Sequence, residues 1–167
     1  MLAAKSGGNI RKRNRNKYAE KKISIQLFSN TLGEEEIKAV RNVFRSRWLG
    51  MGNETKMFEK ELGRKWNCPR TLITNSCTSC FFMSMGILGI GRGDEVIIPS
   101  IHFIGAANAI LDAGAKPVFA DVDAKTLNIM PKEIERLRTE NTKAVFLLHY
   151  GGHPCNLDAI MKTAKKY

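Results

Sequence analysis

Apolar residues recur at helical spacing in the first third of the chain. Thr31 precedes three consecutive acidic residues at 34–36, which suit the positive end of a helix dipole. We therefore expect a helix from this point to near Gly50. Its apolar face should consist of Ile37, Val40, Phe44 and Trp48. After a glycine-bearing loop at 48–52, a second amphipathic helix is expected through Met57, Phe58, Leu62 and Trp66.

From Arg70 onward, short apolar runs alternate with longer amphipathic stretches. The short runs are expected to be strands at 71–74, 95–98, 117–120 and 144–149. The longer stretches are expected to be helices at 78–88, 103–112, 131–138 and 157–166. Apolar strands separated by helices are typical of βαβ units. The pattern therefore predicts an α/β fold, with a mainly parallel sheet flanked by helices on both faces.

The positive charge lies mostly at the N-terminus. The formal net charge of the 167 residues is +11, of which residues 1–22 carry +7. This segment has almost no apolar periodicity, so we predict a basic, disordered extension. Residues 23–69 are then expected to form a helical arm, and 70–167 the first part of the α/β domain. A nucleic-acid-binding tail is the alternative for 1–22, but no aromatic interleaving supports it, and nucleic acid is not an expected partner.

Compartment signals are few. No apolar stretch follows the basic start, as a secretory signal would require. The longest apolar stretch, 81–90, is too short to span a bilayer. Four irregularly spaced cysteines are too few for a disulfide scaffold in a chain of this length. We expect a cytoplasmic protein without a membrane partner.

Two segments are candidates for ligand binding. In 71–80, an expected strand runs into the small residues Ser76, Cys77 and Ser79 and then into a helix. Free backbone N–H groups and the helix dipole at such a turn form an anion site suited to phosphate, although Ser and Thr are also ordinary helix caps. Phe103 follows the end of an expected strand, where an exposed aromatic can stack on a flat ring; the alternative is a core aromatic.

Three further patterns carry weaker hypotheses. Cys77 and Cys80 form a C-x-x-C pair, and His149 and His153 could complete a zinc site, but 68 residues separate the pairs and no metal is expected. A thioredoxin-like redox pair at the two cysteines also lacks further support in the sequence. The glycines at 89–93 resemble a dinucleotide fingerprint, yet they precede a strand and therefore predict a turn.

Nine short motifs follow one another along the chain: WLGMG at 48–52, FEKEL at 58–62, NSCTS at 75–79, GIGRGDEVIIPS at 89–100, ANAI at 107–110, GAKPV at 114–118, DVD at 121–123, TLN at 126–128 and HYGGHP at 149–154. In this order they resemble the DegT/DnrJ/EryC1/StrS family of pyridoxal-phosphate-dependent sugar aminotransferases. The resemblance extends from about residue 23 to residue 167 and implies only the N-terminal portion of a family member. The implied fold is the large domain of an aspartate-aminotransferase-like (fold type I) transferase, present incompletely.

The resemblance implies a cofactor and its contacts. Cys77, Thr78 and Ser79 correspond to the family's phosphate cradle, which acts mostly through backbone N–H groups; Cys77 stands where the family usually has Gly or Ala. Phe103 corresponds to the aromatic residue that stacks on the pyridine ring of pyridoxal 5'-phosphate. Trp48 belongs to a loop similar to one near the nucleotide-sugar site, so it is a candidate substrate contact.

The resemblance also implies amino transfer, typically from glutamate, to a nucleotide-linked keto sugar in cell-surface polysaccharide or glycoside biosynthesis, by a homodimer. This chemistry needs a Schiff-base lysine and an aspartate on the pyridine nitrogen. Neither motif is present in the 167 residues, and Lys162, Lys165 and Lys166 match the solvated end of a helix. No catalytic residue is assigned, and we expect the chain alone to be inactive. The alternative is a non-catalytic remnant that binds pyridoxal phosphate or a partner.

Overall fold

The computed structural model describes residues 29–167, and the chain divides into two compact units after Gly52. The expected basic extension at 1–22 and the first residues of the expected helical arm, 23–28, lie outside the described residues. The boundary expected between residues 69 and 70 stays a prediction. None of the helices in the described part of the chain is long and apolar enough to cross a membrane.

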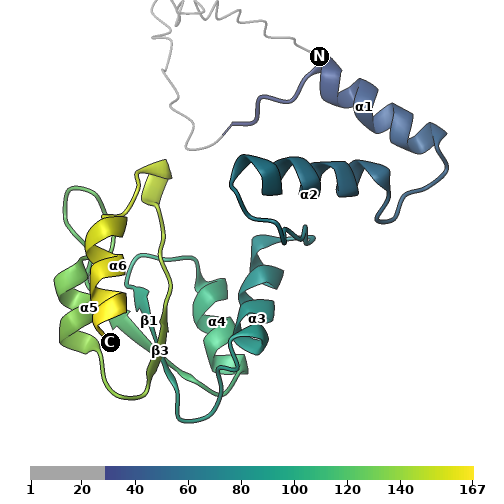
Figure 1. The fold of residues 1–167 in the computed structure, drawn as a ribbon. Helices are drawn as coiled ribbons and strands as arrows, with labels where there is room; N and C mark the ends of the chain where they lie inside the picture. Colours follow the sequence, from purple (N-terminus) through teal and green to yellow (C-terminus); the bar gives the residue numbers. More distant parts are fainter. Residues whose placement is uncertain (1–28) are drawn as a thin grey trace, which may run out of the picture. The chain divides into compact units, whose positions relative to one another are not determined.

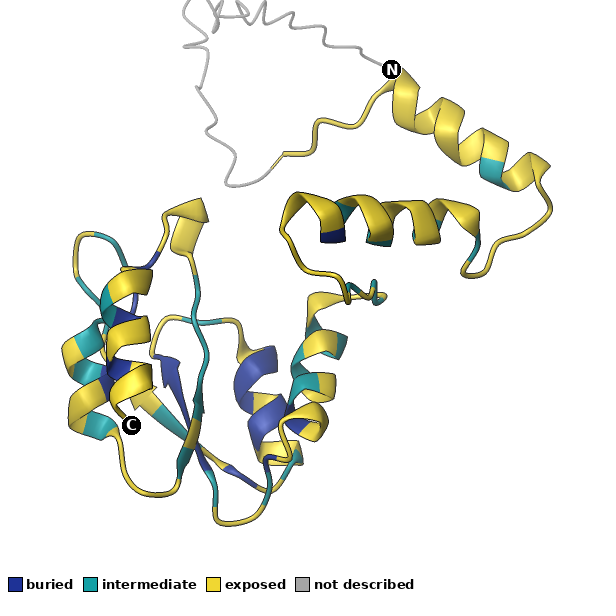
Figure 2. Cartoon of the chain, viewed as in Figure 1, coloured by how far each residue is buried: buried dark blue, intermediate teal, exposed yellow. Residues whose placement is uncertain are grey.

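The described part of the first unit contains one helix, α1 (Glu34–Arg45). Its start differs from the expectation at Thr31: Gly33 is the cap, and its N–H donates to the Glu36 carboxylate at 2.7 Å. The helix ends before Trp48, because Arg47 adopts a positive φ of 60° that a helix cannot continue through. None of its residues is buried, and Figure 2 shows an almost wholly exposed helix.

The second unit holds the remaining elements (Figure 1). They are α2 (Asn53–Lys65), α3 (Cys77–Ile87), β1 (Glu95–Pro99), α4 (Ile104–Asp112), β2 (Lys116–Ala120), α5 (Pro131–Leu137), β3 (Thr142–Val145), the 3-10 turn η1 (Tyr150–Gly152) and α6 (Leu157–Lys166). Pro131 opens α5, where its fixed φ suits the first helical turn. The expected helices at 78–88, 103–112, 131–138 and 157–166 are thus confirmed to within one residue at each end.

A parallel sheet of order β2-β1-β3 forms the centre of this unit. All residues of β1 are buried, and its side chains alternate between two cores. Val96 and Ile98 pack with α3 and α4, whereas Ile97 packs with α5 and α6. Figure 1 shows these helix pairs on opposite faces of the sheet. The expected parallel sheet with helices on both faces is therefore confirmed.

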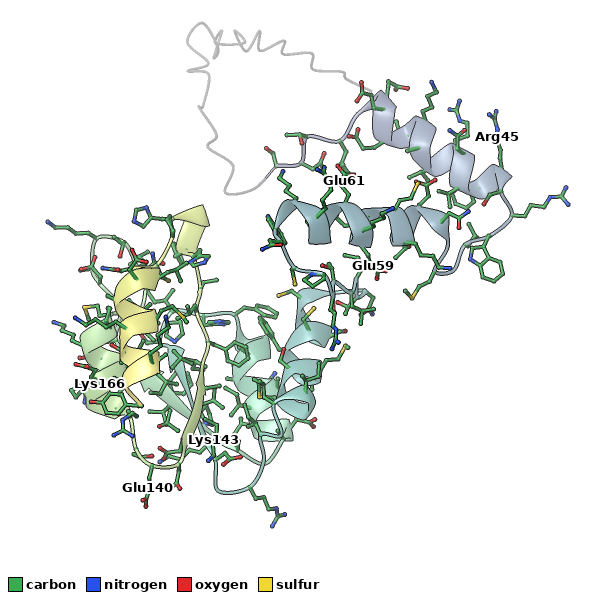
Figure 3. All side chains as sticks on the ribbon, viewed as in Figure 1. Arg45, Glu59, Glu61, Glu140, Lys143 and Lys166 are labelled. Carbon is green, nitrogen blue, oxygen red and sulfur yellow. The ribbon has the colours of Figure 1, made fainter. Side chains whose placement is uncertain are left out.

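Two expected strands differ from the structure. Residues 71–74 are irregular, because they have no ladder partner among the described residues. The Ile73 N–H instead donates to the carboxylate of Glu59 at 2.9 Å. Figure 3 labels Glu59 on α2. The strand expected at 144–149 begins earlier, at Thr142, and ends at Val145. The last hydrogen bond to β1 runs from the Phe146 N–H to the Ile97 carbonyl, and the chain then leaves the sheet.

Both outer strands of the sheet are open edges within the described residues. On β2, Phe119 is 56% exposed and Val118 is only half-buried. The outer side of β3 likewise has no strand beside it in residues 29–167. Within the described residues, the sheet thus exposes an edge and apolar surface.

Candidate functional site

The carboxyl ends of β1 and β3 lie side by side, and the chain leaves them toward opposite faces of the sheet. The segment after β1 leads into α4, which packs on one face. The segment after β3 leads through η1 into α6, which packs on the other face. Open α/β sheets bind ligands in the crevice that such a divergence creates. The site is therefore sought among the residues that follow β1 and β3.

The first turn of α3 presents backbone donors. Ser76 is the cap residue, and its hydroxyl accepts the Ser79 N–H at 3.1 Å. The Ser79 hydroxyl donates to the Asn75 side chain at 2.7 Å. The N–H groups of Cys77 and Thr78 donate to no acceptor within residues 29–167. Two free N–H groups at the positive end of a helix dipole form an anion-binding turn.

Phe103 and this turn both lie close to Gly105. Phe103 is the cap residue of α4 and is 61% exposed. A Cβ atom at Gly105 would lie 2.6 Å from Cε1 of the Phe103 ring and 3.5 Å from Cγ2 of Thr78. The ring thus covers the Gly105 backbone, with Thr78 beside it. The structure therefore brings together Thr78 and Phe103, which are far apart in the sequence, and it leaves the aromatic ring open to solvent rather than in the core.

An aromatic cluster joins α3 to the ends of both strands. The rings of Phe81 on α3, His102 after β1 and Phe146 after β3 pack edge to face, with centroid separations of 5.3–6.2 Å. Such pairs add stability beyond the area they bury. The cluster fixes the start of α3 next to the divergence of β1 and β3. Neither His102 nor Phe146 has a sequence signal that marks this role.

The segment after β3 is braced by buried groups. Asn128 is buried, and its side chain accepts the Tyr150 N–H and donates to the His153 carbonyl, each at 3.0 Å. The Nδ1 atom of His149 accepts the Cys155 N–H at 3.1 Å, so the neutral ring carries its proton on Nε2. Burial raises the pKa of the Cys155 thiol.

Trp48 belongs to the first unit and is described there by itself. Its indole N–H donates to the Met51 carbonyl at 3.1 Å, and the ring is 63% exposed. A Cβ atom at Gly52 would lie 2.9 Å from the indole ring, so the loop closes tightly around this side chain. The indole N–H is therefore occupied, and only the ring surface is free for a ligand.

In the part of the chain that the structure describes, no three His, Cys, Asp or Glu side chains gather as a metal site would require.

The glycines at 89–93 form the turn expected before β1, with positive φ at Gly89 and Gly93. Asp123 holds an ordinary turn: its carboxylate accepts the N–H groups of Lys125 and Thr126, which lowers its pKa.

Comparison with known proteins identifies the family. A sequence model of the DegT/DnrJ/EryC1/StrS aminotransferase family matches residues 30–167. The chain belongs to this family. It is 44% identical over 138 residues to the dTDP-4-dehydro-2,3,6-trideoxy-D-glucose 4-aminotransferase of Saccharopolyspora spinosa, a match that covers 81% of this chain and 36% of the relative.

Solved structures agree with this assignment. The aminotransferase TlmJ from Streptoalloteichus hindustanus matches with a TM-score of 0.81 and 46% identity, over 85% of this chain and 39% of TlmJ. The sugar aminotransferase Spr1654 of Streptococcus pneumoniae, in its pyridoxal-phosphate form, matches with a TM-score of 0.75 and 32% identity, over 81% of this chain and 35% of that protein. Spr1654 is also known in the pyridoxamine-phosphate form. The expected family, fold class and family cofactor are confirmed.

The chain spans between one third and two fifths of the length of these relatives. Within that span, its residues fit the family's cofactor. The turn at Cys77 and Thr78 offers two free donors for a phosphate group, and Phe103 offers an exposed ring face beside it. Gly105 is the residue that the sequence analysis missed. Only the close contact with Phe103 reveals it, because glycine is common in helices for other reasons.

Proposed function

We propose that this chain supplies the phosphate-binding and ring-stacking part of a cytoplasmic, pyridoxal-phosphate-dependent aminotransferase that acts on nucleotide-linked keto sugars. One observation carries the proposal: the turn with the free N–H groups of Cys77 and Thr78 and the exposed ring of Phe103 meet at Gly105, where a Cβ atom would lie 2.6 Å from the ring and 3.5 Å from Cγ2 of Thr78. A phosphate group and a flat aromatic ring are the two chemical features of the cofactor that such a turn and such a ring recognise.

The cofactor phosphate would be held by the first turn of α3. The N–H groups of Cys77 and Thr78 would donate to its oxygens, and the helix dipole would favour its negative charge. Ser79 stabilises this turn but adds no third free donor, because its N–H already donates to the Ser76 hydroxyl. Ser76 and Ser79 thus keep the turn in the conformation that directs the two free donors outward.

Phe103 would cover one face of the cofactor ring and exclude water from it. Pyridoxal phosphate, when bound, supplies an electron-withdrawing ring that stabilises negative charge on the carbon that loses a proton. After β3, His149 has its Nδ1 atom engaged by the Cys155 N–H. Its neutral ring can therefore donate a hydrogen bond only from Nε2, to an acceptor on a ligand at the end of β3.

The substrate class is proposed from the relatives, one of which is named for a dTDP-linked keto sugar. We expect glutamate as the amino donor and a homodimeric complete enzyme, with the exposed ring of Trp48 as a sugar or base contact. We expect no amino transfer by the 167-residue chain alone, because its sequence lacks the family's lysine and aspartate motifs. Purified chain supplied with cofactor, glutamate and a nucleotide-linked keto sugar tests this; cofactor-dependent formation of an amino sugar would contradict it.

Binding of pyridoxamine 5'-phosphate tests the cofactor site without turnover. This probe has no aldehyde, so it cannot attach covalently to surface lysines. We expect Phe103→Leu to weaken its binding by about three- to tenfold, the worth of one aromatic stacking contact. Phe119→Leu is the matched control, because Phe119 is similarly exposed but lies on β2. Equal affinity in the two variants, or no binding by the unmodified chain, would overturn the proposal.

A further inference from the structure

Two exposed thiols lie one helical turn apart in the first turn of α3. Cys77 is the first residue of the helix and Cys80 the fourth, and both are exposed. Of the other two cysteines, Cys68 is exposed on the segment after α2, and Cys155 is buried between the sheet and α6. Only Cys77 and Cys80 are separated by a single turn of one helix.

The spacing of these two residues is close to what a disulfide requires. Side chains three apart on a helix have Cβ atoms about 5–6 Å apart. A disulfide needs a Cβ separation of about 3.5–4.5 Å and accepts a Cα separation of about 4.4–6.8 Å. Bond formation therefore requires the Cβ atoms of Cys77 and Cys80 to approach by one or two ångströms, which is a local movement of the backbone.

The first turn of α3 can make this movement at small cost. The N–H groups of Cys77 and Thr78 have no acceptor within residues 29–167. The bond from the Cys80 N–H to the Ser76 carbonyl is 3.4 Å long, beyond the usual range for a backbone hydrogen bond. This long bond is the one that a tightening of the turn loses most easily, while the bond from the Ser79 N–H to the Ser76 hydroxyl at 3.1 Å has to adjust with it.

The Cys80 thiol has one hydrogen-bond partner, which disulfide formation would have to replace. The Thr74 hydroxyl donates to the Ser76 carbonyl at 2.9 Å, so its oxygen accepts the Cys80 thiol, whose sulfur lies 3.0 Å away. The two intervening side chains point elsewhere: Thr78 lies toward Gly105, and Ser79 bonds to Asn75.

We propose that Cys77 and Cys80 are a reversible dithiol–disulfide pair, oxidised by exchange with a low-molecular-weight disulfide. The thiolate of one cysteine attacks the small disulfide, forms a mixed disulfide and releases one small thiolate. The second cysteine then attacks the protein sulfur of the mixed disulfide and releases the other. Both protein thiols lose a proton, the small disulfide gains two electrons, and protonation gives two small thiols.

The bond would have a consequence for the site, which rests on the proposed function. It would join the first and fourth residues of the turn whose free N–H groups are assigned to the cofactor phosphate. Closing the turn moves the Cys77 N–H relative to the Thr78 N–H, so the two donors no longer match one phosphate group. We expect the oxidised chain to bind pyridoxamine 5'-phosphate about tenfold more weakly than the reduced chain, as for the loss of one charge-assisted hydrogen bond.

Redox titration of the whole chain tests the pair directly. The protein is equilibrated with defined ratios of reduced and oxidised glutathione, quenched with acid, denatured and alkylated, and its cysteine peptides are analysed by mass spectrometry. We expect oxidising ratios to protect Cys77 and Cys80 together, with the loss of two hydrogen atoms, while the exposed Cys68 forms only a glutathione adduct and the buried Cys155 remains alkylated. Cys77→Ser and Cys80→Ser should each instead trap glutathione on the remaining thiol, and Cys68→Ser should behave like the unmodified chain.

Two results would overturn the pair: alkylation of Cys77 and Cys80 at every ratio, or separate glutathione adducts on both without an internal bond. The pyridoxamine 5'-phosphate affinity is interpreted independently of the peptide masses. Equal affinity of reduced and oxidised chains would refute the effect on the phosphate turn. Failure of the reduced chain to bind pyridoxamine 5'-phosphate would count against the proposed function, while the peptide masses would still decide whether the disulfide forms.

Discussion

The ring of Phe103 rests on the backbone of Gly105, so closely that a methyl group at position 105 would lie 2.6 Å from ring atom Cε1. This contact sets the ring beside Thr78, whose Cγ2 atom lies 3.5 Å from the same point. The absence of a side chain at residue 105 therefore decides where the aromatic face is presented. It links the phosphate turn of α3 to the start of α4.

Gly105→Ala should displace the Phe103 ring without unfolding the protein. Phe103 is exposed, so its ring can swing into solvent, and alanine favours the helix. We expect the free energy of unfolding to change by less than about 1 kcal/mol, whereas affinity for pyridoxamine 5'-phosphate should fall by about as much as in Phe103→Leu. Urea unfolding and ligand titration measure the two quantities.

Gly86→Ala is the control for helix propensity, because a Cβ atom there meets nothing within 4 Å. It should leave ligand affinity unchanged and stabilise α3 by about 0.5–1 kcal/mol. The role assigned to Gly105 would be wrong if both alanine variants bound the ligand alike.

Ser76 has a separable role in stability and in binding. Ser76→Ala removes the acceptor of the Ser79 N–H and should cost about 1 kcal/mol of unfolding free energy. Asn156→Ala at the cap of α6, where the side chain accepts the Ala159 N–H, should cost a similar amount. Only the change at Ser76 should also weaken ligand binding.

Ser76→Asp separates helix capping from phosphate binding. Aspartate is a good helix cap, so stability should be retained. Its negative charge beside Cys77 and Thr78 should repel a phosphate group and abolish measurable binding of pyridoxamine 5'-phosphate. Retained affinity in this variant would show that the phosphate does not lie at the start of α3.

Asn128 should control the order of the segment after β3. Its buried side chain bonds to the Tyr150 N–H and the His153 carbonyl, so Asn128→Ala leaves both groups without their partner. We expect a loss of about 1–3 kcal/mol in unfolding free energy. Amide hydrogen exchange should also accelerate at Tyr150 more than at the buried Ile97. Unchanged exchange at Tyr150 would contradict the bracing role.

Glu95 makes stability depend on pH. Its carboxylate accepts the Thr139 hydroxyl at 2.6 Å and the Lys116 ammonium at 2.9 Å, and these bonds hold its pKa below the ordinary value of 4.5. A carboxylate with a lowered pKa stabilises the fold fully above that ordinary value, and the stabilisation is lost as the pH falls through the folded-state pKa.

Glu95→Gln should therefore destabilise the chain at pH 7, and its deficit against the unmodified chain should shrink as the pH falls below 4.5. Urea unfolding over a pH series measures this. Glu140→Gln is the control, since Glu140 is exposed and its side chain makes no hydrogen bond within residues 29–167. A deficit that stayed constant with pH would exclude the assigned linkage.

The sequence pattern predicted the elements whose apolar periodicity or start signal agrees with their place in the fold. The continuous apolar run at Val96, Ile97 and Ile98 corresponds to a strand buried on both faces, and α5 begins at the proline that favours its first turn. The segment at 71–74 has the composition of a strand, but a strand also requires a ladder partner, and none lies within residues 29–167. Composition cannot supply that information.

The functional site could likewise be predicted from the sequence only in part. Small residues before a helix indicated the anion-binding turn, because free N–H groups are a property of every helix start. The convergence of Phe81, His102 and Phe146 arises only when the ends of β1 and β3 lie side by side. The departure of Trp48 from the helix depends on the positive φ of Arg47, a residue type that rarely adopts it.

The most direct test follows the backbone amides of the phosphate turn. The ¹⁵N-labelled 167-residue chain, kept reduced, is titrated with pyridoxamine 5'-phosphate and, separately, with pyridoxamine, which lacks the phosphate. We expect the amide resonances of Cys77 and Thr78 to shift strongly only with the phosphorylated probe, with Gly105 shifting as the ring stacks on Phe103. Unchanged Cys77 and Thr78 resonances at saturating probe, or equal shifts with both compounds, would contradict the assignment of the cofactor phosphate to the start of α3.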